Sequence, residues 1–508
     1  MGNEKKGFDT EKYLITQVKT ITDRVKRFER KLYLEFGGKL CYDHHAFRVL
    51  PGFDIDTKVK ILRKLKEKSE IIYCISAKDI QKGKIRYDFK LTYGDQTLKD
   101  INDLKERGLK VSCVVITRID REEDVKKFKR RLENYGNEVY FHYEIEGYPN
   151  KIDLVVSDDG YGRQPYIKTR KPIVVVTGPG PGSGKMSFCL SQVYHGRKLN
   201  IKSGFAKFET FPIWNLPINH PVNVAYEAST ADLDDVNMID PFHLQAYNIT
   251  AVNYNRDIEN FSIMKNIIDK IIDKNDPLAL YKSPTDMGVN QAKIGIINDD
   301  IVREASKQEI IRRYFRYKRE LIEGIGNPQT IERMKILMQK VGVKSEDRKV
   351  VEPARKAAID AERKGKGDRN IFCGAAIELP NGNIIVGKNS QLLHAESAAI
   401  LNAIKTLANI PDEINLLAPN IIYNISNLKK TILGGKSESL NVEETITALA
   451  ISSATNPMTE LALKMLKKLK NCEMHTTHIT SEGDEAPLRK LGINITNDTN
   501  LTPYPHFN

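Results

Sequence analysis

The chain has 508 residues, of which 40% are hydrophobic and 29% are charged, and its formal net charge is +13. One compact core cannot hold this length, so we expect two to four globular domains. No apolar run has the length of a membrane span. The six scattered cysteines contain no C-x-x-C pair, so a zinc ribbon is excluded. Cysteines spaced in this way favour a reducing cytoplasm. Aromatic residues do not alternate with the basic ones, so we expect neither a membrane nor a nucleic acid as partner.

Strand-like runs alternate with amphipathic helical runs through the first third of the chain. This alternation predicts an α/β fold with a mainly parallel sheet, whose ligands bind beyond the carboxyl ends of the strands. The predicted helices cover residues 9–31, 57–68, 98–107 and 122–135, and the predicted strands cover residues 32–36, 70–76, 109–117, 138–144, 152–157 and 173–176.

The last of these strands runs into a glycine-rich loop and then a helical segment, as in a phosphate-binding P-loop. Main-chain N–H groups of such a loop and the positive end of the helix can hold a phosphate, and Lys185 can reach its outer oxygens. The residues expected to bind the ligand are Gly178, Gly180, Gly182, Ser183, Gly184, Lys185 and Ser187.

Two departures from the P-loop template weaken the prediction of hydrolysis. Pro179 stands where the template has its first glycine, and Met186 stands where a Ser or Thr hydroxyl binds Mg²⁺. Ser187 comes one step later and points about 100° away around the helix. The sequence therefore predicts phosphate binding, with a rigid Pro/Gly turn as the alternative.

Acidic residues near the loop are the candidates for metal binding and catalysis. Asp158 and Asp159 follow the predicted strand 152–157, where a carboxylate can hold Mg²⁺ through water, although an Asx turn is the alternative. Asp235 belongs to the acidic stretch 231–240, which is either a cation site or a solvated loop. Glu209 follows a short apolar run and can orient a nucleophile. We expect Lys185, Asp158 and Glu209 to be catalytic, and ATP or another nucleoside triphosphate with Mg²⁺ to be the cofactor.

The rest of the chain changes character twice. Residues 208–255 are rich in proline, aromatic and acidic residues, which predicts an ordered irregular segment. Helices are predicted over residues 257–274 and 299–364, and an α/β unit with a hairpin at 373–388 follows. The predicted domains are an α/β phosphate-loop domain at 1–255, a helical region at 256–367 and a C-terminal α/β domain at 368–508.

The C-terminal domain opens a helix with His394-Ala395-Glu396 directly after its hairpin. Zinc-dependent nucleoside deaminases use His-x-Glu in this position, but they also need a P-C-x-x-C segment, and Cys472 stands alone here. We therefore expect a deaminase-like topology without zinc.

Five segments together resemble a bacterial family that is described as a conserved protein of unknown function. They are residues 37–40, 178–186, 208–217, 232–241 and 281–290. The resemblance extends over nearly the whole chain. It implies a multi-domain cytoplasmic protein with a C-terminal unit of cytidine-deaminase-like topology, and it supplies no activity.

These observations lead to three expectations about function. The first is an enzyme, expected to be a homo-oligomer, that binds a nucleotide or another phosphorylated small molecule and transfers a phosphoryl or nucleotidyl group by positioning and charge neutralisation. The second is a non-catalytic ligand-binding or regulatory protein that uses the same loop as an anion nest. The third is an assembly scaffold built on the helices of residues 299–364.

Overall fold

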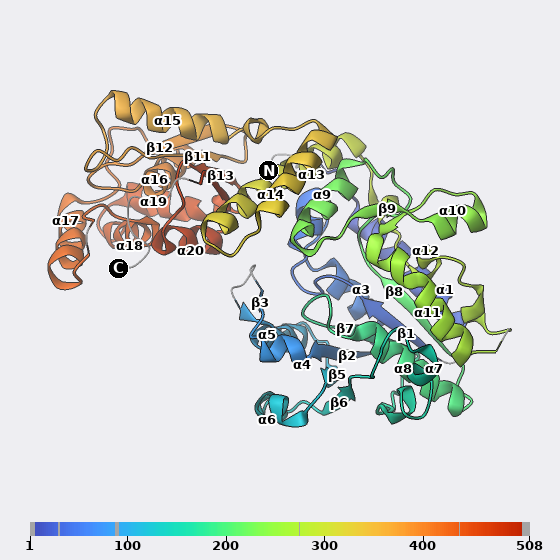
Figure 1. Ribbon diagram of the computed structural model, residues 1–508. Coiled ribbons are helices and arrows are strands. Elements are labelled where there is room, and N and C mark those ends of the chain that lie inside the picture. Colours follow the sequence, from blue (N-terminus) through green and yellow to red (C-terminus); the bar gives the residue numbers. More distant parts are fainter. Residues whose placement is uncertain (1–5, 29–30, 87–90, 274, 436, 500–508) are drawn as a thin grey trace. The chain divides into compact units, whose positions relative to one another are not determined.

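The computed structural model describes residues 6–28, 31–86, 91–273, 275–435 and 437–499, and Figure 1 shows its helices and strands. The chain divides into two compact units, one reaching to Lys307 and one beginning at Gln308. Each unit is described by itself below.

A six-stranded sheet forms the centre of the N-terminal unit. Its strands stand in the order β6-β5-β2-β7-β1-β8, and every neighbouring pair is parallel. The five predicted strands that lie in this sheet are confirmed, and β8 is a sixth that the sequence did not predict. The strands are β1 (Lys31–Phe36), β2 (Ser69–Ser76), β5 (Val111–Ile119), β6 (Val139–Tyr143), β7 (Ile173–Thr177) and β8 (Ser203–Phe208).

The connections between these strands run in two opposite directions across the sheet. The connections that follow β1, β2 and β5 run toward the β6 edge, and the one between β7 and β8 runs toward the other edge. Because such crossovers are right-handed, we infer that α3 (Thr57–Leu65), α5 (Tyr93–Glu106) and α6 (Lys126–Asn134) cover one face and α8 (Lys185–Lys198) the other. The neighbouring strands β2 and β7 thus lead to helices on opposite faces. Open α/β sheets bind ligands beyond the carboxyl ends of two such strands.

The predicted strand at residues 152–157 is wrong, because the chain forms the short helix α7 (Ile152–Val155) there. Its main chain closes helical bonds, with the Val155 N–H donating to the Lys151 carbonyl over 3.0 Å. A run of six residues is too short to separate a period of two from a period of 3.6, which explains the error.

The aromatic segment after β8 is ordered, as predicted. Phe211 and Tyr226 stack with ring centroids 5.3 Å apart, and both residues lie near Tyr254. Short elements carry this part of the chain: α9 (Pro221–Ser229), β9 (Asn237–Ile239), α10 (Pro241–Tyr247), β10 (Val252–Tyr254), α11 (Asn255–Ile271) and α12 (Pro284–Met287).

The C-terminal unit contains a four-stranded mixed sheet in the order β12-β11-β13-β14. β11 is antiparallel to both of its neighbours and β13 is parallel to β14, so the predicted hairpin is confirmed. The strands are β11 (Gly374–Glu378), β12 (Ile384–Lys388), β13 (Glu473–Thr476) and β14 (Asn494–Asn497). The helices include α14 (Pro328–Val341), α15 (Val351–Arg363), α16 (Ala395–Ala408), α17 (Pro419–Asn427), α18 (Val442–Ser452), α19 (Pro457–Met465) and α20 (Glu482–Lys490).

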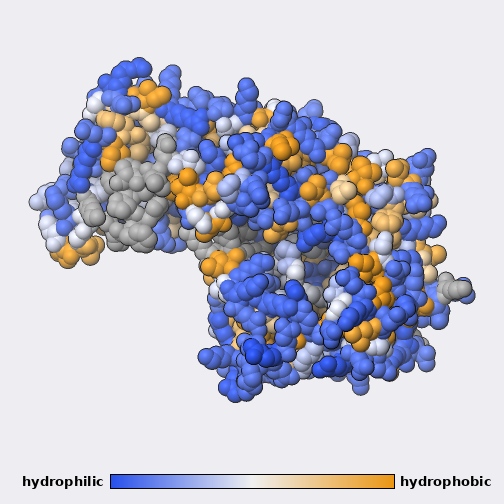
Figure 2. Space-filling model, viewed as in Figure 1, coloured by the Kyte–Doolittle hydropathy of each residue, from blue (hydrophilic) through white to orange (hydrophobic). Residues whose placement is uncertain are grey.

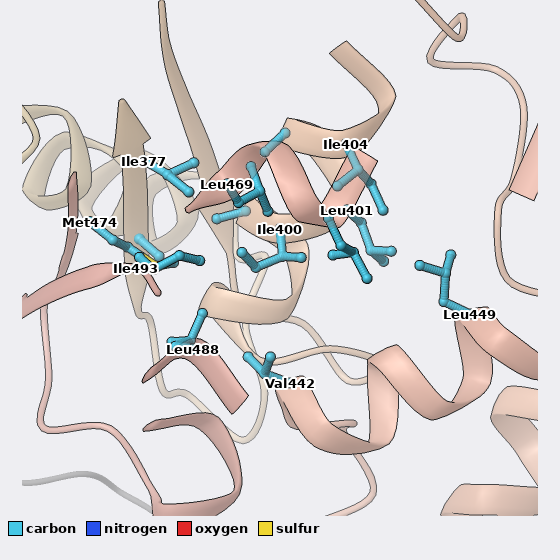
Figure 3. Close-up of a cluster of buried hydrophobic side chains, with 14 of the residues drawn as sticks. Ile377, Ile400, Leu401, Ile404, Val442, Leu449, Leu469, Met474, Leu488 and Ile493 are labelled. Carbon is cyan, nitrogen blue, oxygen red and sulfur yellow. The ribbon is translucent and has the colours of Figure 1, made fainter. Parts of the chain in front are cut away.

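A large apolar core joins the sheet to the helices of the C-terminal unit, and a smaller cluster lies under α15. Figure 3 shows Ile377 and Met474 from the sheet beside Ile400 of α16, and all three side chains are at most 1% exposed. Burial of one such side chain contributes roughly 1.5–3 kcal/mol. The core thus holds α16 against the sheet.

The residues expected to form a separate helical region divide between the two units. α11 packs on α7 and α8 in the first unit, and α15 packs on β11 and β12 in the second. The connecting helix α13 (Asp299–Ile322) contains the boundary between the two units.

In the view of Figure 2 most of the described surface is hydrophilic. Among the described residues, no helix combines the length and the apolar character needed to cross a bilayer.

Candidate functional site

The loop between β7 and α8 follows a path that only glycine permits at two points. A Cβ at Gly178 would lie 2.4 Å from the Cys74 carbonyl oxygen of the neighbouring strand. Gly184 has φ = +74°, and a Cβ there would lie 2.6 Å from the Thr117 hydroxyl. A side chain at either position would therefore displace the loop from the edge of the sheet.

Several main-chain N–H groups of this loop have no acceptor among the described residues. Among the described residues, the N–H groups of Gly180 and of residues 182–185 donate no hydrogen bond to the protein. The loop is held by other atoms: the Ser183 hydroxyl donates to the Gly180 carbonyl over 2.5 Å, and the Thr117 hydroxyl donates to the Ser183 carbonyl over 2.9 Å. Since α8 begins at Lys185, its positive end adds to the N–H groups of the loop, and the combination suits an anion.

Two oxygen atoms lie near the Lys185 ammonium group. Its Nζ is 3.4 Å from the Gly180 carbonyl oxygen and 3.9 Å from Oε1 of Glu35, the penultimate residue of β1. The side chains of Lys185 and Glu35 are 10% and 13% exposed. Oε2 of Glu35 is buried and accepts no hydrogen bond within the described part of the chain. The separation of 3.9 Å leaves the ammonium able to contact a ligand in the loop.

A second group of charges lies at the end of β8, on the far side of β1 from the loop. The Lys207 ammonium donates to Oδ1 of Asp257, in the first turn of α11, over 2.6 Å. Burial disfavours the charged ammonium, but the carboxylates of Asp257, Glu35 and Glu209 outweigh burial and raise the pKa of Lys207. This lysine therefore remains charged.

Glu209 lies between the two groups and titrates near neutrality. Burial, reinforced by the negative charge of Asp257, raises the pKa of its carboxyl group to about 7. Glu35 acts in the same direction, whereas Lys207 and Lys185 oppose the shift. A Cβ at residue 37 would lie 2.4 Å from Glu209 Oε1, so the glycine found there lets the carboxyl group approach the end of β1. The five charged side chains form one electrostatic unit, which we call the sheet-edge charge cluster.

A pocket with a cavity volume of about 40 Å³, open to solvent, adjoins this cluster. It combines apolar walls with the charged ends of three cluster members, as small-molecule sites do. Its lining residues are Lys207, Glu209, Phe211, Pro212, Trp214, Val252, Asn253, Asp257, Pro284, Thr285, Gly288 and Asn290.

The structure does not bring Asp158 and Asp159 to the loop. The Asp158 carboxylate pairs with Lys198 and accepts a hydrogen bond from the Tyr194 hydroxyl over 3.1 Å. Both partners belong to the last turns of α8, whose fourteen residues span about 20 Å, whereas Lys185 begins that helix. Both acids are exposed and follow α7 rather than the tip of a strand.

The other predicted residues have local structural partners. Asp235 is buried against Arg256, with Oδ1 2.5 Å from the guanidinium Nε. Ser187 lies beside the phenols of Tyr148 and Tyr161. Of the predicted catalytic residues, Lys185 and Glu209 are brought together and Asp158 is not.

Sequence reasoning assigned no site role to Glu35, Lys207 or Asp257. The signals were present, because Glu35 is the penultimate residue of a predicted strand and Lys207 stands two residues before Glu209. Alternate residues of a strand share one side of it, so the pair was accessible to pattern reasoning once β8 was known.

Comparisons with known proteins cover both units. The family model described as "Domain of unknown function DUF1846, N-terminal" matches residues 6–342, and the one described as "Domain of unknown function DUF1846, C-terminal" matches residues 346–504. A UPF0371 protein of Clostridium botulinum (strain Alaska E43 / Type E3) is 52% identical over 497 residues, which is 98% of each chain. A UPF0371 protein of Clostridium tetani (strain Massachusetts / E88) is 52% identical over 495 residues, or 97% of each chain. The chain therefore belongs to the DUF1846 family.

Proposed function

We propose that this protein is an enzyme that binds a nucleotide or another phosphorylated small molecule at loop 178–187 and transfers its phosphoryl or nucleotidyl group. The observation that carries the proposal is the position of Glu209. Its carboxyl group has a pKa of about 7 and belongs to one charge cluster with Lys185. A group that titrates near the working pH is suited to accept and return a proton.

The residues divide the work between binding and proton transfer. The N–H groups of the loop and the Lys185 ammonium neutralise the phosphate and hold it in place. Glu209 accepts the proton of an acceptor hydroxyl bound in the adjoining pocket. Lys207 stabilises negative charge that develops there, and Asp257 positions its ammonium group.

A divalent cation fits this arrangement at Glu35. The carboxylate ends a strand adjacent to β7, and its buried Oε2 accepts no hydrogen bond among the described residues. A hard cation takes such oxygen ligands together with phosphate oxygens. Metal binding by Asp158, Asp159 or Asp235 stays a prediction. Glu35 is the better candidate, because Asp158 and Asp159 lie far from the loop and Asp235 is paired with Arg256.

A non-catalytic binding protein is the second candidate. Met186 favours it, because this residue replaces the hydroxyl that binds magnesium in P-loop enzymes. The same N–H groups would then hold an anion without chemistry. Catalysis is preferred because a simple anion nest gives no reason for a carboxyl group poised near neutrality.

Thermal unfolding with and without ligands tests the binding step. ATP, GTP and inorganic phosphate are added separately, each with and without Mg²⁺, and a bound ligand raises the melting temperature. Lys185→Ala should abolish the rise. Lys198→Ala is the matched control, since it removes a lysine from the other end of the same helix. The proposal is overturned if none of these anions raises the melting temperature, or if both variants respond alike.

Product formation then separates the two candidates. Phosphoryl transfer leaves a nucleoside diphosphate behind, and nucleotidyl transfer releases diphosphate. The formation of either product from the triphosphate that stabilises the protein is measured at pH 7.5. In an enzyme, Glu209→Gln should retain the ligand-induced rise in melting temperature and lose turnover by roughly 10²-fold or more. Ligand binding without turnover in the wild-type chain would favour the binding protein.

A further inference from the structure

A second group of polar side chains is buried in the C-terminal unit, where four residues from three segments converge. His394 caps the N-terminus of α16 and Glu396 lies in its first turn. His478 follows the end of β13, and Asp484 lies in the first turn of α20. The side chains of these four residues are at most 8% exposed.

The polar atoms of this group pair with one another. Nδ1 of His394 is 2.8 Å from Oδ2 of Asp484, and Nε2 of His478 is 3.2 Å from Oε1 of Glu396. One ligand atom each of His394, Glu396 and Asp484 can be chosen so that all lie within 4.8 Å of one another. The His394 imidazole and two carboxylates thus surround one small volume, and the His478 imidazole pairs with the Glu396 carboxylate beside it.

The two carboxylates differ in how well protein groups satisfy them. Asp484 accepts hydrogen bonds from the Val442 N–H over 2.9 Å and from the Ser481 hydroxyl over 2.6 Å, in addition to its contact with His394. Glu396 is 0% exposed, and within the described part of the chain neither of its oxygens accepts a hydrogen bond. The His478 imidazole beside Oε1 is a charged partner of Glu396, whereas its buried Oε2 has no hydrogen bond among the described residues, so Oε2 is the atom that calls for a ligand.

We propose that the C-terminal unit binds a divalent transition metal of the zinc class through His394, Glu396 and His478. Two imidazoles and one carboxylate are a ligand set of zinc and of non-haem iron(II). Asp484 accepts the Nδ1–H of His394, which fixes the tautomer whose lone pair is on Nε2 and orients the ring, as carboxylates beside metal-bound histidines do.

This site removes the argument by which the sequence excluded zinc. That argument required two cysteine thiolates after the His-x-Glu segment, and the chain has none there. The fold instead brings Asp484 beside His394 and His478 beside Glu396. Cys373 also lies beside His478, so a thiol is within reach of the same cluster.

Metal analysis of the full-length protein tests the proposal. The purified chain is stripped with a chelator and dialysed, and Zn²⁺, Co²⁺, Mn²⁺ and Fe²⁺ are each titrated under reducing conditions. Bound metal is measured by elemental analysis and calorimetry, and the visible absorption of the Co²⁺ form reports the ligand geometry. We expect about one equivalent of Zn²⁺ or Co²⁺ per chain.

Three variants locate the metal, and one matched control accompanies them. Glu396→Gln and His478→Gln should lose the metal, and Asp484→Asn should weaken its affinity about 10–100-fold. His475→Gln is the control, since His475 is a buried histidine of β13 whose ring nitrogen Nδ1 is 2.9 Å from the Thr496 hydroxyl and which lies outside the cluster. Circular dichroism checks that each variant is folded.

The wild-type titration decides the question even if a variant does not fold. The proposal is wrong if the stripped wild-type chain takes up none of the four metals. It is also wrong if folded Glu396→Gln and His478→Gln bind metal as tightly as the control. Neither result bears on the phosphate loop, because loop and cluster belong to different units.

Discussion

Replacing Glu209 with glutamine should stabilise the N-terminal unit at alkaline pH. The folded protein holds this carboxyl group at a pKa of about 7, against an ordinary value of 4.5. Between these two values the folded state binds the proton more tightly than the unfolded state does. Stability therefore falls as the pH rises through this window, because the folded chain must either retain a proton or bury a charge.

The size of the effect follows from the two pKa values. The full difference corresponds to about 3 kcal/mol of unfolding free energy. The glutamine side chain has nearly the same shape and stays neutral at every pH. The gain in stability of Glu209→Gln over the wild type should thus be about 2–3 kcal/mol larger at pH 8 than at pH 5.

Urea unfolding at the two pH values measures this difference. Trp214 is the sole tryptophan of the chain and lines the pocket beside Glu209, so its fluorescence reports the unit concerned. Glu67→Gln is the matched control, because the side chain of Glu67 is 84% exposed. If Glu209→Gln changes the unfolding free energy equally at pH 5 and pH 8, the carboxyl group is not poised near neutrality and the assigned proton transfer fails with it.

Four further substitutions test the geometry by urea unfolding. Gly184→Ala should lower the free energy of unfolding more than Gly182→Ala does. Both glycines have a positive φ, which costs an alanine about 1–2 kcal/mol, but only at Gly184 would the new Cβ also lie 2.6 Å from the Thr117 hydroxyl. Equal losses in the two variants would contradict this reasoning. Arg348→Met should cost roughly 3–5 kcal/mol, because the 1% exposed guanidinium pairs with Glu473 and bonds to carbonyls of β13 and β14; a loss below 1 kcal/mol would contradict this. Burial raises the pKa of the Asp498 carboxyl group, but the hydrogen bonds from the Arg355 guanidinium lower it, and the net pKa is lowered. The wild type should therefore lose stability as the pH falls below about 4. Asp498→Asn should flatten that loss, and an unchanged acid slope would show that the pair contributes nothing.

Local patterns were enough for most elements and for the loop. The apolar run at 173–176 and the glycines after it predict a strand, a loop and a helix, and the structure has β7 and α8 there. The same periodicity found α16 and the hairpin before it. These features depend on neighbours within a few residues, which the sequence displays directly.

The composition of the two candidate sites depended on tertiary structure. Glu35, Glu209 and Asp257 meet only because β1 and β8 are neighbours and α11 begins beside them, although up to 222 positions separate these residues in the sequence. Likewise, Glu396 meets His478 only through the packing of α16 against the sheet. The order of the strands is set by packing over the whole unit, and periodicity within a segment carries no information about it. The sequence by itself determined most of the elements and the glycine loop, and the tertiary structure decided which charged side chains face one another.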